Sequence, residues 1–189
     1  MADLPRVTHI LEAAGLGPDL SGIAPAVLEE ARRRGSLVHA AIEAHAYGVL
    51  APSDVTPEIK PYLDGYEAFL RDTGHVPIVS EYRVVHPVWQ YAGTLDRVGW
   101  ATPTVRSIDD FKAVATVDLW AVARQLAAYR LGWNAVRPSE PVGCVRAVQL
   151  LPGDYRLFEK EIMEILGQAE QEFLAALVVY QARLRRGRA

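Results

Sequence analysis

The stretch Ser107–Val114, SIDDFKAV, decides the fold of this chain, because it combines the pattern of a buried strand with three charged residues. Apolar residues flank it as in a buried strand, yet Asp109, Asp110 and Lys112 fall within four positions. An unpaired buried charge costs on the order of several kcal/mol, whereas a whole domain has a net stability of only about 5–15 kcal/mol. The three charges therefore need partners, and the candidates are a salt-bridge network, solvent at the end of the strand, or a divalent metal ion.

Strand geometry divides these charges between two faces. Because side chains alternate along a strand, Asp110 and Lys112 share one face with Ile108, while Asp109 and Phe111 point the other way. A slip of one residue in register would put Asp109 in the place of Asp110 and turn Lys112 away from it. We therefore expect Asp110 to be the acid that works with Lys112.

Composition describes an ordinary soluble globular chain. The 189 residues are 50% hydrophobic and 23% charged, which suits a single domain with a real core. The net charge of −3 gives no general attraction to nucleic acid or to anionic membranes, so a polyanion would need a local basic patch. Arg32, Arg33 and Arg34 form one such cluster and are candidate DNA contacts, although a solvated helix face explains them equally well.

A single cysteine, Cys144, excludes a disulfide framework, a zinc-finger pattern and an iron–sulfur cluster held by four thiolates. The first residues lack the layout of a signal peptide, and no apolar run is long enough to span a bilayer. We therefore expect a cytoplasmic protein that does not bind membranes.

Hydrophobic periodicity predicts one domain over residues 1–189. Helices are expected at about 8–14, 25–47 (with a break at Gly35 as an alternative) and 57–72. Three short strands of an antiparallel meander follow within 77–87, 89–100 and 103–114. A helix over 119–133, a strand over 142–151 with a turn into YRLF, and a final helix over about 160–185 complete the chain. This order indicates an α/β sandwich, a mixed sheet with helices on both sides.

Asp96 is an acid inside the apolar, alternating segment GTLDRV, and the meander would place it beside Asp110. Two carboxylates on neighbouring strands repel each other unless a cation lies between them. Oxygen ligands, with the carbonyl of Phe111 as one more, favour Mg²⁺ or Mn²⁺, and a histidine ligand such as His39 would favour Mn²⁺. Taken alone, His39 is more typical of a core histidine, and Asp96 of an ion pair.

Five segments together resemble a known family. RGSLVHAAIE, EYRVV, GTLDRV, SIDDFKAV and ARQLAAY occur in the order and approximate spacing of the PD-(D/E)XK nuclease superfamily, in its RecB-like branch of phage and repair exonucleases without an iron–sulfur cluster. The resemblance covers Gly35 to Tyr129, about half of the chain. It implies a restriction-endonuclease-like core, here over about 25–151, with a mixed central β-sheet flanked by α-helices.

The resemblance also assigns roles to residues. His39 is similar to the family's metal-ligating helix histidine, Asp96 and Asp110 to its two motif acids, and Lys112 to its motif lysine. Gln125 and Tyr129 resemble the family's Q-x-x-x-Y pair. The resemblance also implies the Phe111 carbonyl as a metal ligand, and Glu43 and Glu81 in supporting positions. The family's usual tyrosine and threonine beside the lysine are replaced by Phe111 and Ala113, and the proline before Asp96 by Leu95.

The implied function is that of a bacterial or phage-encoded deoxyribonuclease, most simply an exonuclease, that uses Mg²⁺ or Mn²⁺ to activate water against DNA phosphodiester bonds. An oligomer, or a partner protein of recombination or replication, is compatible with this assignment. One alternative is a non-catalytic nucleic-acid-binding or assembly subunit with the same fold. Another is an unrelated α/β protein whose charges form a structural network.

Overall fold

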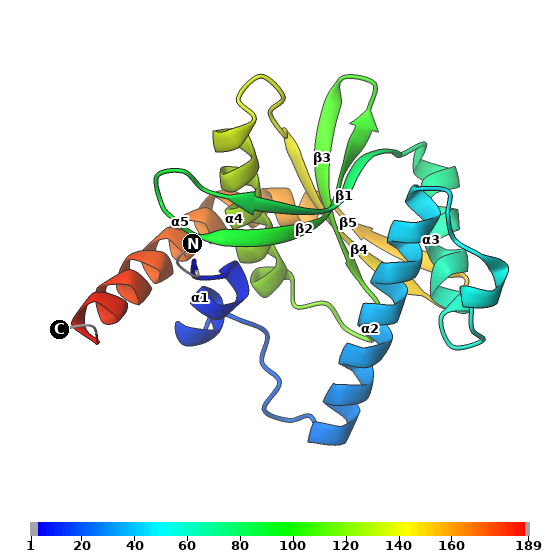
Figure 1. The fold of residues 1–189 in the computed structure, drawn as a ribbon, viewed down its shortest axis with the longest axis horizontal. Coiled ribbons are helices and arrows are strands. Elements are labelled where there is room, and N and C mark those ends of the chain that lie inside the picture. The colour runs from blue at the N-terminus through cyan, green and yellow to red at the C-terminus, as the bar shows by residue number, and fades with distance from the viewer. Residues whose placement is uncertain (1–3, 188–189) are drawn as a thin grey trace.

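A five-stranded mixed sheet forms the centre of the computed structural model, which describes residues 4–187 (Figure 1). The strands lie in the order β1 (Val76–Val85), β2 (Ala92–Thr102), β3 (Val105–Lys112), β4 (Cys144–Leu151) and β5 (Asp154–Phe158). The helices are α1 (Val7–Ala13), α2 (Pro25–Ala46), α3 (Lys60–Thr73), α4 (Leu119–Val136) and α5 (Lys160–Arg186), with a short 3₁₀ turn at Pro52–Asp54.

Strands β1, β2 and β3 form the expected antiparallel meander, and α4 then crosses over so that β4 pairs with β3 in parallel. Strand β5 returns antiparallel to β4. One face of the sheet packs against α1, α4 and α5, and the other against α2 and α3, each with its own apolar cluster (Figure 1). The structure thus confirms the expected α/β class, a mixed sheet flanked by helices.

Local details decide between two alternatives for α2 and depart from the expectations in two places. Helix α2 runs through Gly35 without a break, because Val38, Ala41 and Ile42 in its second half are buried and offset the roughly 1 kcal/mol that a glycine costs in a helix. Helix α3 begins at Lys60 rather than at Pro57. Residues 154–158, expected only as the continuation of a turn, form a full edge strand.

Asp109, the first charged residue of SIDDFKAV, has buried partners. Its carboxylate is fully buried on the α2/α3 face, and Arg146, its neighbour in the β3–β4 ladder, donates a hydrogen bond from Nε at 2.5 Å. His75 Nε2 lies 3.2 Å from the second carboxylate oxygen, and Ser107 donates to that oxygen at 3.2 Å. The first of the three charges is therefore held by a buried salt-bridge network.

Arg97 lies beside this network on β2. It is paired directly with Asp109 across the β2–β3 ladder, and its guanidinium is completely buried. Nη1 donates to Tyr66 Oη at 2.8 Å, and the guanidinium lies over the ring of Phe111. Asp109 therefore sits between arginines of the two neighbouring strands, Arg97 and Arg146.

We expect Asp109→Asn to lower the free energy of unfolding by about 3–5 kcal/mol, because it leaves Arg146 buried without its carboxylate. Urea denaturation followed by circular dichroism measures the change. Asp72→Asn is the matched control, since Asp72 pairs with Arg71 at the surface and such pairs contribute about 0–1 kcal/mol. A loss below about 1 kcal/mol for Asp109→Asn would contradict the network's role.

His75 makes stability depend on pH. Burial, aided by Arg146 and Arg97 against the opposing effect of Asp109, lowers the pKa of His75 to about 4 from an ordinary value of 6.5. Because the folded protein holds this imidazole neutral, its contribution is complete above about pH 6.5 and is lost as pH falls toward about 4, at up to about 1.4 kcal/mol per unit. We expect His75→Gln to show a flatter decline of melting temperature in that window. Parallel curves for the two proteins would exclude this role of His75.

Candidate metal centre

Three acidic residues occupy one row across the meander. In the β1–β2 ladder, the pairs Ser80 with Arg97 and Tyr82 with Leu95 leave Glu81 facing Asp96. The β2–β3 ladder ends at the pair of Arg97 with Asp109, and the next residues of the two strands are Asp96 and Asp110. Asp96 Oδ2 accepts a hydrogen bond from the amide of Phe111 at 2.9 Å. Thus β1, β2 and β3 each contribute one carboxylate to the same place.

Glu81 holds an unusual backbone conformation for this purpose. Its φ of 48° lies in the left-handed region, between neighbours that pair regularly with β2. For a residue with a side chain this conformation costs about 1–2 kcal/mol. Strain of this kind is commonly retained at functional sites, where it aims a side chain in a direction that regular strand geometry does not allow.

His39 comes to this row from α2. Its Nδ1 lies 3.6 Å from Glu81 Oε1 and 3.6 Å from Asp96 Oδ2, while Nε2 is 3.0 Å from the carbonyl oxygen of Phe111. One ligand atom from each of His39, Glu81 and Asp96 lies within 4.8 Å of the others. One imidazole nitrogen and two carboxylates suit Mn²⁺ or Mg²⁺, so the donor set fits the metal that the sequence suggested.

Electrostatics at this group favour a cation. Burial alone would lower the pKa of His39, but the carboxylates of Asp96, Glu81 and Asp110 outweigh it and raise the pKa to about 9. Burial raises the pKa of Asp96 to about 6, although the neighbouring His39 acts in the opposite direction. At neutral pH a proton on His39 therefore supplies part of the positive charge that a metal ion would bring.

Asp110 lies beside this group and belongs to a second set of contacts. Its Oδ1 accepts hydrogen bonds from Lys112 Nζ at 3.0 Å and from Gln125 Nε2 at 3.1 Å. The same Gln125 amide donates to Tyr129 Oη at 3.0 Å. The register preferred from the sequence is the observed one, since Asp110 and Lys112 share a face and Asp109 lies on the other.

Lys112 is held as a cation by these acids. Burial alone would lower its pKa, but the carboxylates of Asp110 and Asp96 outweigh burial and raise the pKa above its ordinary value. Its Nζ also lies 2.8 Å from Asp110 Oδ2, and the side chain remains 26% exposed. Lys112 therefore presents a positive charge to whatever approaches the row of carboxylates.

Tyr129 reaches the site only because residue 93 is a glycine. A Cβ at Gly93 would come within 2.4 Å of the Tyr129 ring and 3.2 Å of Val7. Helix α4 could not approach β2 this closely with any larger residue there. The short distance between helix and strand is what allows Tyr129 to anchor Gln125 against Asp110.

The remaining predicted site residues are Glu43 and the arginines of the basic cluster, and most of them do not contact the site. Glu43, expected in a supporting position, makes no side-chain hydrogen bond or ion pair within residues 4–187. Arg33 is bound by Glu30 and Glu58, and Arg34 lies over the ring of Tyr62. Only Arg32 of the basic cluster lines a cavity next to the site.

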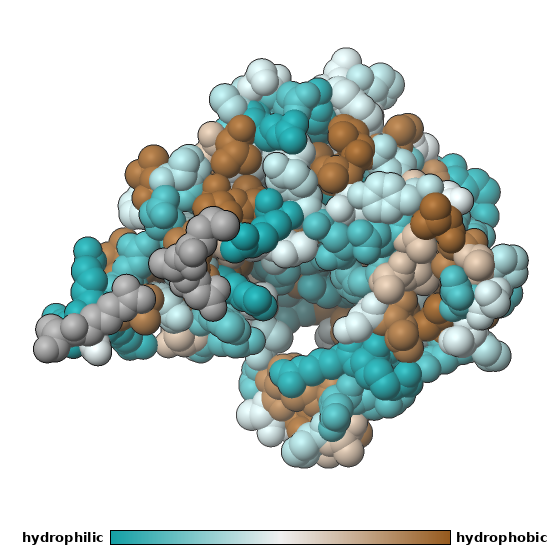
Figure 2. All heavy atoms as spheres, viewed as in Figure 1, coloured by the Kyte–Doolittle hydropathy of each residue, from teal (hydrophilic) through white to brown (hydrophobic). Residues whose placement is uncertain are grey.

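That cavity, of about 690 Å³, lies between α1, the segment before α2, and the start of α4. Its lining combines the basic Arg32 and Lys112, the acidic Glu12, Asp19 and Asp118, the amide of Gln125, and apolar side chains such as Leu11, Leu20 and Ile23. Figure 2 shows the molecule hollowed between the start of α2 and the remainder of the fold. Lys112 and Gln125 are therefore reached from an open cleft of mixed charge and partly apolar lining.

Sequence reasoning missed Gln149, a buried side chain on β4 that pairs with Lys112 in the β3–β4 ladder. Its amide donates to the carbonyls of Val114 and Ala115, both at 2.9 Å. These bonds fix the chain directly after Lys112 and so help to place the lysine. The available signal was the glutamine and arginine inside the otherwise apolar strand CVRAVQLL.

Comparisons with known proteins yield little. No family model and no curated protein matches the chain. Among solved structures, a candidate exonuclease from Eubacterium rectale is 13% identical with a TM-score of 0.45, over 89% of this chain and 73% of that one. The protein SSO0001 is 15% identical with a TM-score of 0.33, over 77% and 71%. Neither neighbour is similar enough to assign a function to this chain.

Within the described residues, no helix is long and apolar enough to cross a membrane.

We expect Mn²⁺ affinity to rise with pH, because the ion must displace the proton that His39 holds up to about pH 9. Between about pH 6.5 and 8.5 the gain should approach tenfold per unit, with about one proton released per ion in calorimetry. His39→Asn should weaken binding and flatten this dependence. The matched control is His45→Asn on the same helix, which should preserve both. A flat pH profile in the wild type would contradict the assignment of His39.

Proposed function

We propose that this protein is a metal-dependent DNA nuclease, and specifically an exonuclease that hydrolyses phosphodiester bonds. The observation that carries the proposal is the single row of Glu81, Asp96 and Asp110 across three strands, with His39 on one side and Lys112 on the other. Oxygen-rich donor sets beside a lysine are suited to phosphoryl transfer, in which positioning and charge stabilisation do most of the work.

His39, Glu81 and Asp96 would hold the metal ion. We assign Nδ1 of His39 as its ligand atom, because Nε2 is occupied by the carbonyl of Phe111, a typical outer partner of a metal-bound imidazole. Phe111 then orients the histidine instead of binding the metal directly, which revises its expected role. When bound, the ion lowers the pKa of a coordinated water and withdraws charge from the phosphoryl oxygens.

Asp110 and Lys112 would act next to that position. Asp110 aims the ammonium group through contacts of 3.0 and 2.8 Å, and Gln125, fixed by Tyr129, restrains Asp110 from the helix side. The raised pKa of Lys112 favours the role of a fixed positive charge that stabilises the developing negative charge on the phosphate. In the cleft beside the site, Arg32 and Lys112 are the cations that would contact a phosphate, while Glu12, Asp19 and Asp118 line it as well.

Lys112→Gln tests the chemical part of this proposal. We expect it to lower kcat by about 10²–10³-fold, the usual effect of removing one electrostatic donor from a transition state, while DNA affinity changes far less. Single-turnover hydrolysis and binding in EDTA separate the two. Lys60→Gln, at an exposed pair with Asp64, is the matched control and should retain full activity. Full turnover by Lys112→Gln would remove this lysine from the mechanism.

The mode of attack is tested with end-labelled linear DNA beside a closed circle, in Mg²⁺, Mn²⁺ or EDTA. We expect metal-dependent loss of the linear substrate alone, abolished by Asp96→Asn. Cleavage of the circle would make the protein an endonuclease. Cleavage of neither, with metal bound, would favour the non-catalytic DNA-binding subunit.

A further inference from the structure

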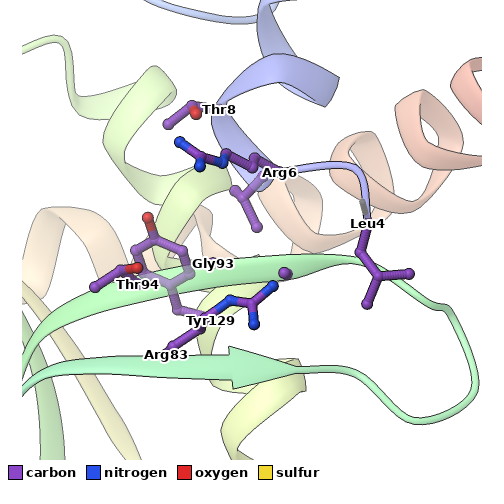
Figure 3. A pocket seen from close by; sticks show the side chains of 9 residues that line it. Leu4, Arg6, Thr8, Arg83, Gly93, Thr94 and Tyr129 are labelled. Carbon is purple, nitrogen blue, oxygen red and sulfur yellow. The ribbon is translucent and has the colours of Figure 1, made fainter. Parts of the chain in front are cut away.

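A second cavity, of about 390 Å³, adjoins the row of carboxylates on the first half of β2 (Figure 3). Four polar side chains line it around the buried Tyr129: Arg6, Thr8, Arg83 and Thr94. We call it the arginine pocket. Arg83 and Thr94 face each other as a direct pair in the β1–β2 ladder, whereas Arg6 and Thr8 come from the start of the chain.

The edge of β2 explains how the start of the chain arrives there. Strand β3 pairs with β2 only from Arg97 onward, so the first half of β2 has an unpaired edge on that side. Pro5 fills part of it by accepting a hydrogen bond from the amide of Ala92 at 2.9 Å, and Arg6 bridges Ala92 in parallel. Figure 3 shows Arg6 entering from the segment before α1, above the strand that carries Arg83.

The arginine pocket brings two positively charged side chains close to the carboxylates of the candidate metal centre. Among residues 4–187, neither Arg6 nor Arg83 forms a salt bridge or a side-chain hydrogen bond. This contrasts with Arg124, Arg130 and Arg146, which are all bound to acids. Among the residues that the structure describes, no acidic one lines the arginine pocket itself, although the chain as a whole has a net charge of −3.

Its chemistry suits one class of ligand. Guanidinium groups bind phosphate oxygens through paired, directional hydrogen bonds, and threonine hydroxyls add neutral donors. Two arginines and two threonines around one small cavity therefore form a receptor for a phosphate group. The aromatic wall contributed by Tyr129 is buried and limits access of water from that side.

The arginine pocket lies next to the candidate metal centre along the same strands. Arg83 follows Glu81 by two residues, and Thr94 precedes Asp96 by two. Along β2 the backbone of Thr94 is therefore one strand repeat, about 6.6–6.8 Å, from that of Asp96. Tyr129 belongs to both places, because its hydroxyl accepts the hydrogen bond of the Gln125 amide that also binds Asp110. A nucleic-acid strand at the metal centre would therefore meet the arginine pocket with a nearby phosphate.

We propose that the arginine pocket binds a phosphate group of the DNA strand whose neighbouring phosphodiester lies at the metal centre. The inference rests on the proposed nuclease function and adds to it a positioning site, Arg6 and Arg83, that sets where along the strand hydrolysis occurs. The phosphate is either the terminal monoester of a strand end or an internal diester. Both present the same oxygens to the two arginines.

The test is binding in EDTA, where no cleavage occurs, of short single-stranded oligonucleotides that carry a 5′-phosphate, a 3′-phosphate or no terminal phosphate. Fluorescence anisotropy of wild type, Arg6→Gln and Arg83→Gln gives affinity as a function of salt. Each substitution should weaken binding about tenfold or more, as expected for a charge-assisted hydrogen bond, and should reduce the salt slope by about 0.7. Arg71→Gln, at a surface pair on α3, is the matched control and should change neither.

The three oligonucleotides identify the source of the phosphate. If a terminal monoester is bound, removing one particular end phosphate weakens binding to the wild type but not to the variants. If an internal diester is bound, the three bind alike and the variants still bind them all more weakly. Unchanged affinity and salt slope in both arginine variants, or no binding by the wild type, would overturn the proposal.

Failure of this inference is separable from failure of the nuclease assignment. With Mn²⁺ added, an active enzyme whose arginine variants keep wild-type affinity would reject the arginine pocket alone. Arginine-dependent binding without any hydrolysis would reject the nuclease and leave the phosphate site standing.

Discussion

The buried pair of Asp109 and Arg146 is the interaction on which the rest of this structure depends. It ties β3 to β4 at one position of a parallel ladder, and the buried Arg97 on β2 is the ladder partner of Asp109 on the other side. A slip of one residue would leave these charges buried without partners, at a cost of about 3–5 kcal/mol. The network on one face thereby fixes the register that puts Asp110 and Lys112 on the other.

With this register, the candidate metal centre lies at the point where β2 and β3 separate. β2 pairs with β3 over its second half only, and the two separate where Asp96 faces Asp110. His39 enters this opening from the α2 side and Gln125 from the α4 side, so each layer of helices contributes one polar contact to the carboxylates. Below the divergence, the start of the chain covers the free edge of β2 and brings Arg6 toward Arg83. The candidate metal ligands thus come from α2, β1 and β2, the lysine from β3, and the two arginines from β1 and the segment before α1.

Much of this arrangement could be predicted from local sequence. Alternation in SIDDFKAV separated Asp109 from Asp110, and the spacing of four between Gln125 and Tyr129 placed both on one side of α4, where they meet. The meander also brought Asp96 beside Asp110, as two short connections between strands require. These relations are set by the period of strands and helices, which a sequence displays directly.

The rest depends on contacts between distant segments. His75 meets Arg146 across 71 positions, and no periodic pattern indicates such a pairing. Glu81 was expected only in a supporting position, because the positive φ that turns it toward His39 and Asp96 has no signature in the residue type. Gln149 and Arg6 act through backbone and edge contacts that exist only once the sheet is assembled.

A crystal structure with Mn²⁺, located by its anomalous scattering, tests the central claim that strands β1 and β2 and helix α2 build one metal site. The account predicts an ion within about 2.5 Å of His39 Nδ1 and of carboxylate oxygens from Glu81 and Asp96, with Lys112 and Asp110 beside it. An ion bound elsewhere, or a site that remains empty at saturating Mn²⁺ while His39 stays paired with both acids, would contradict it.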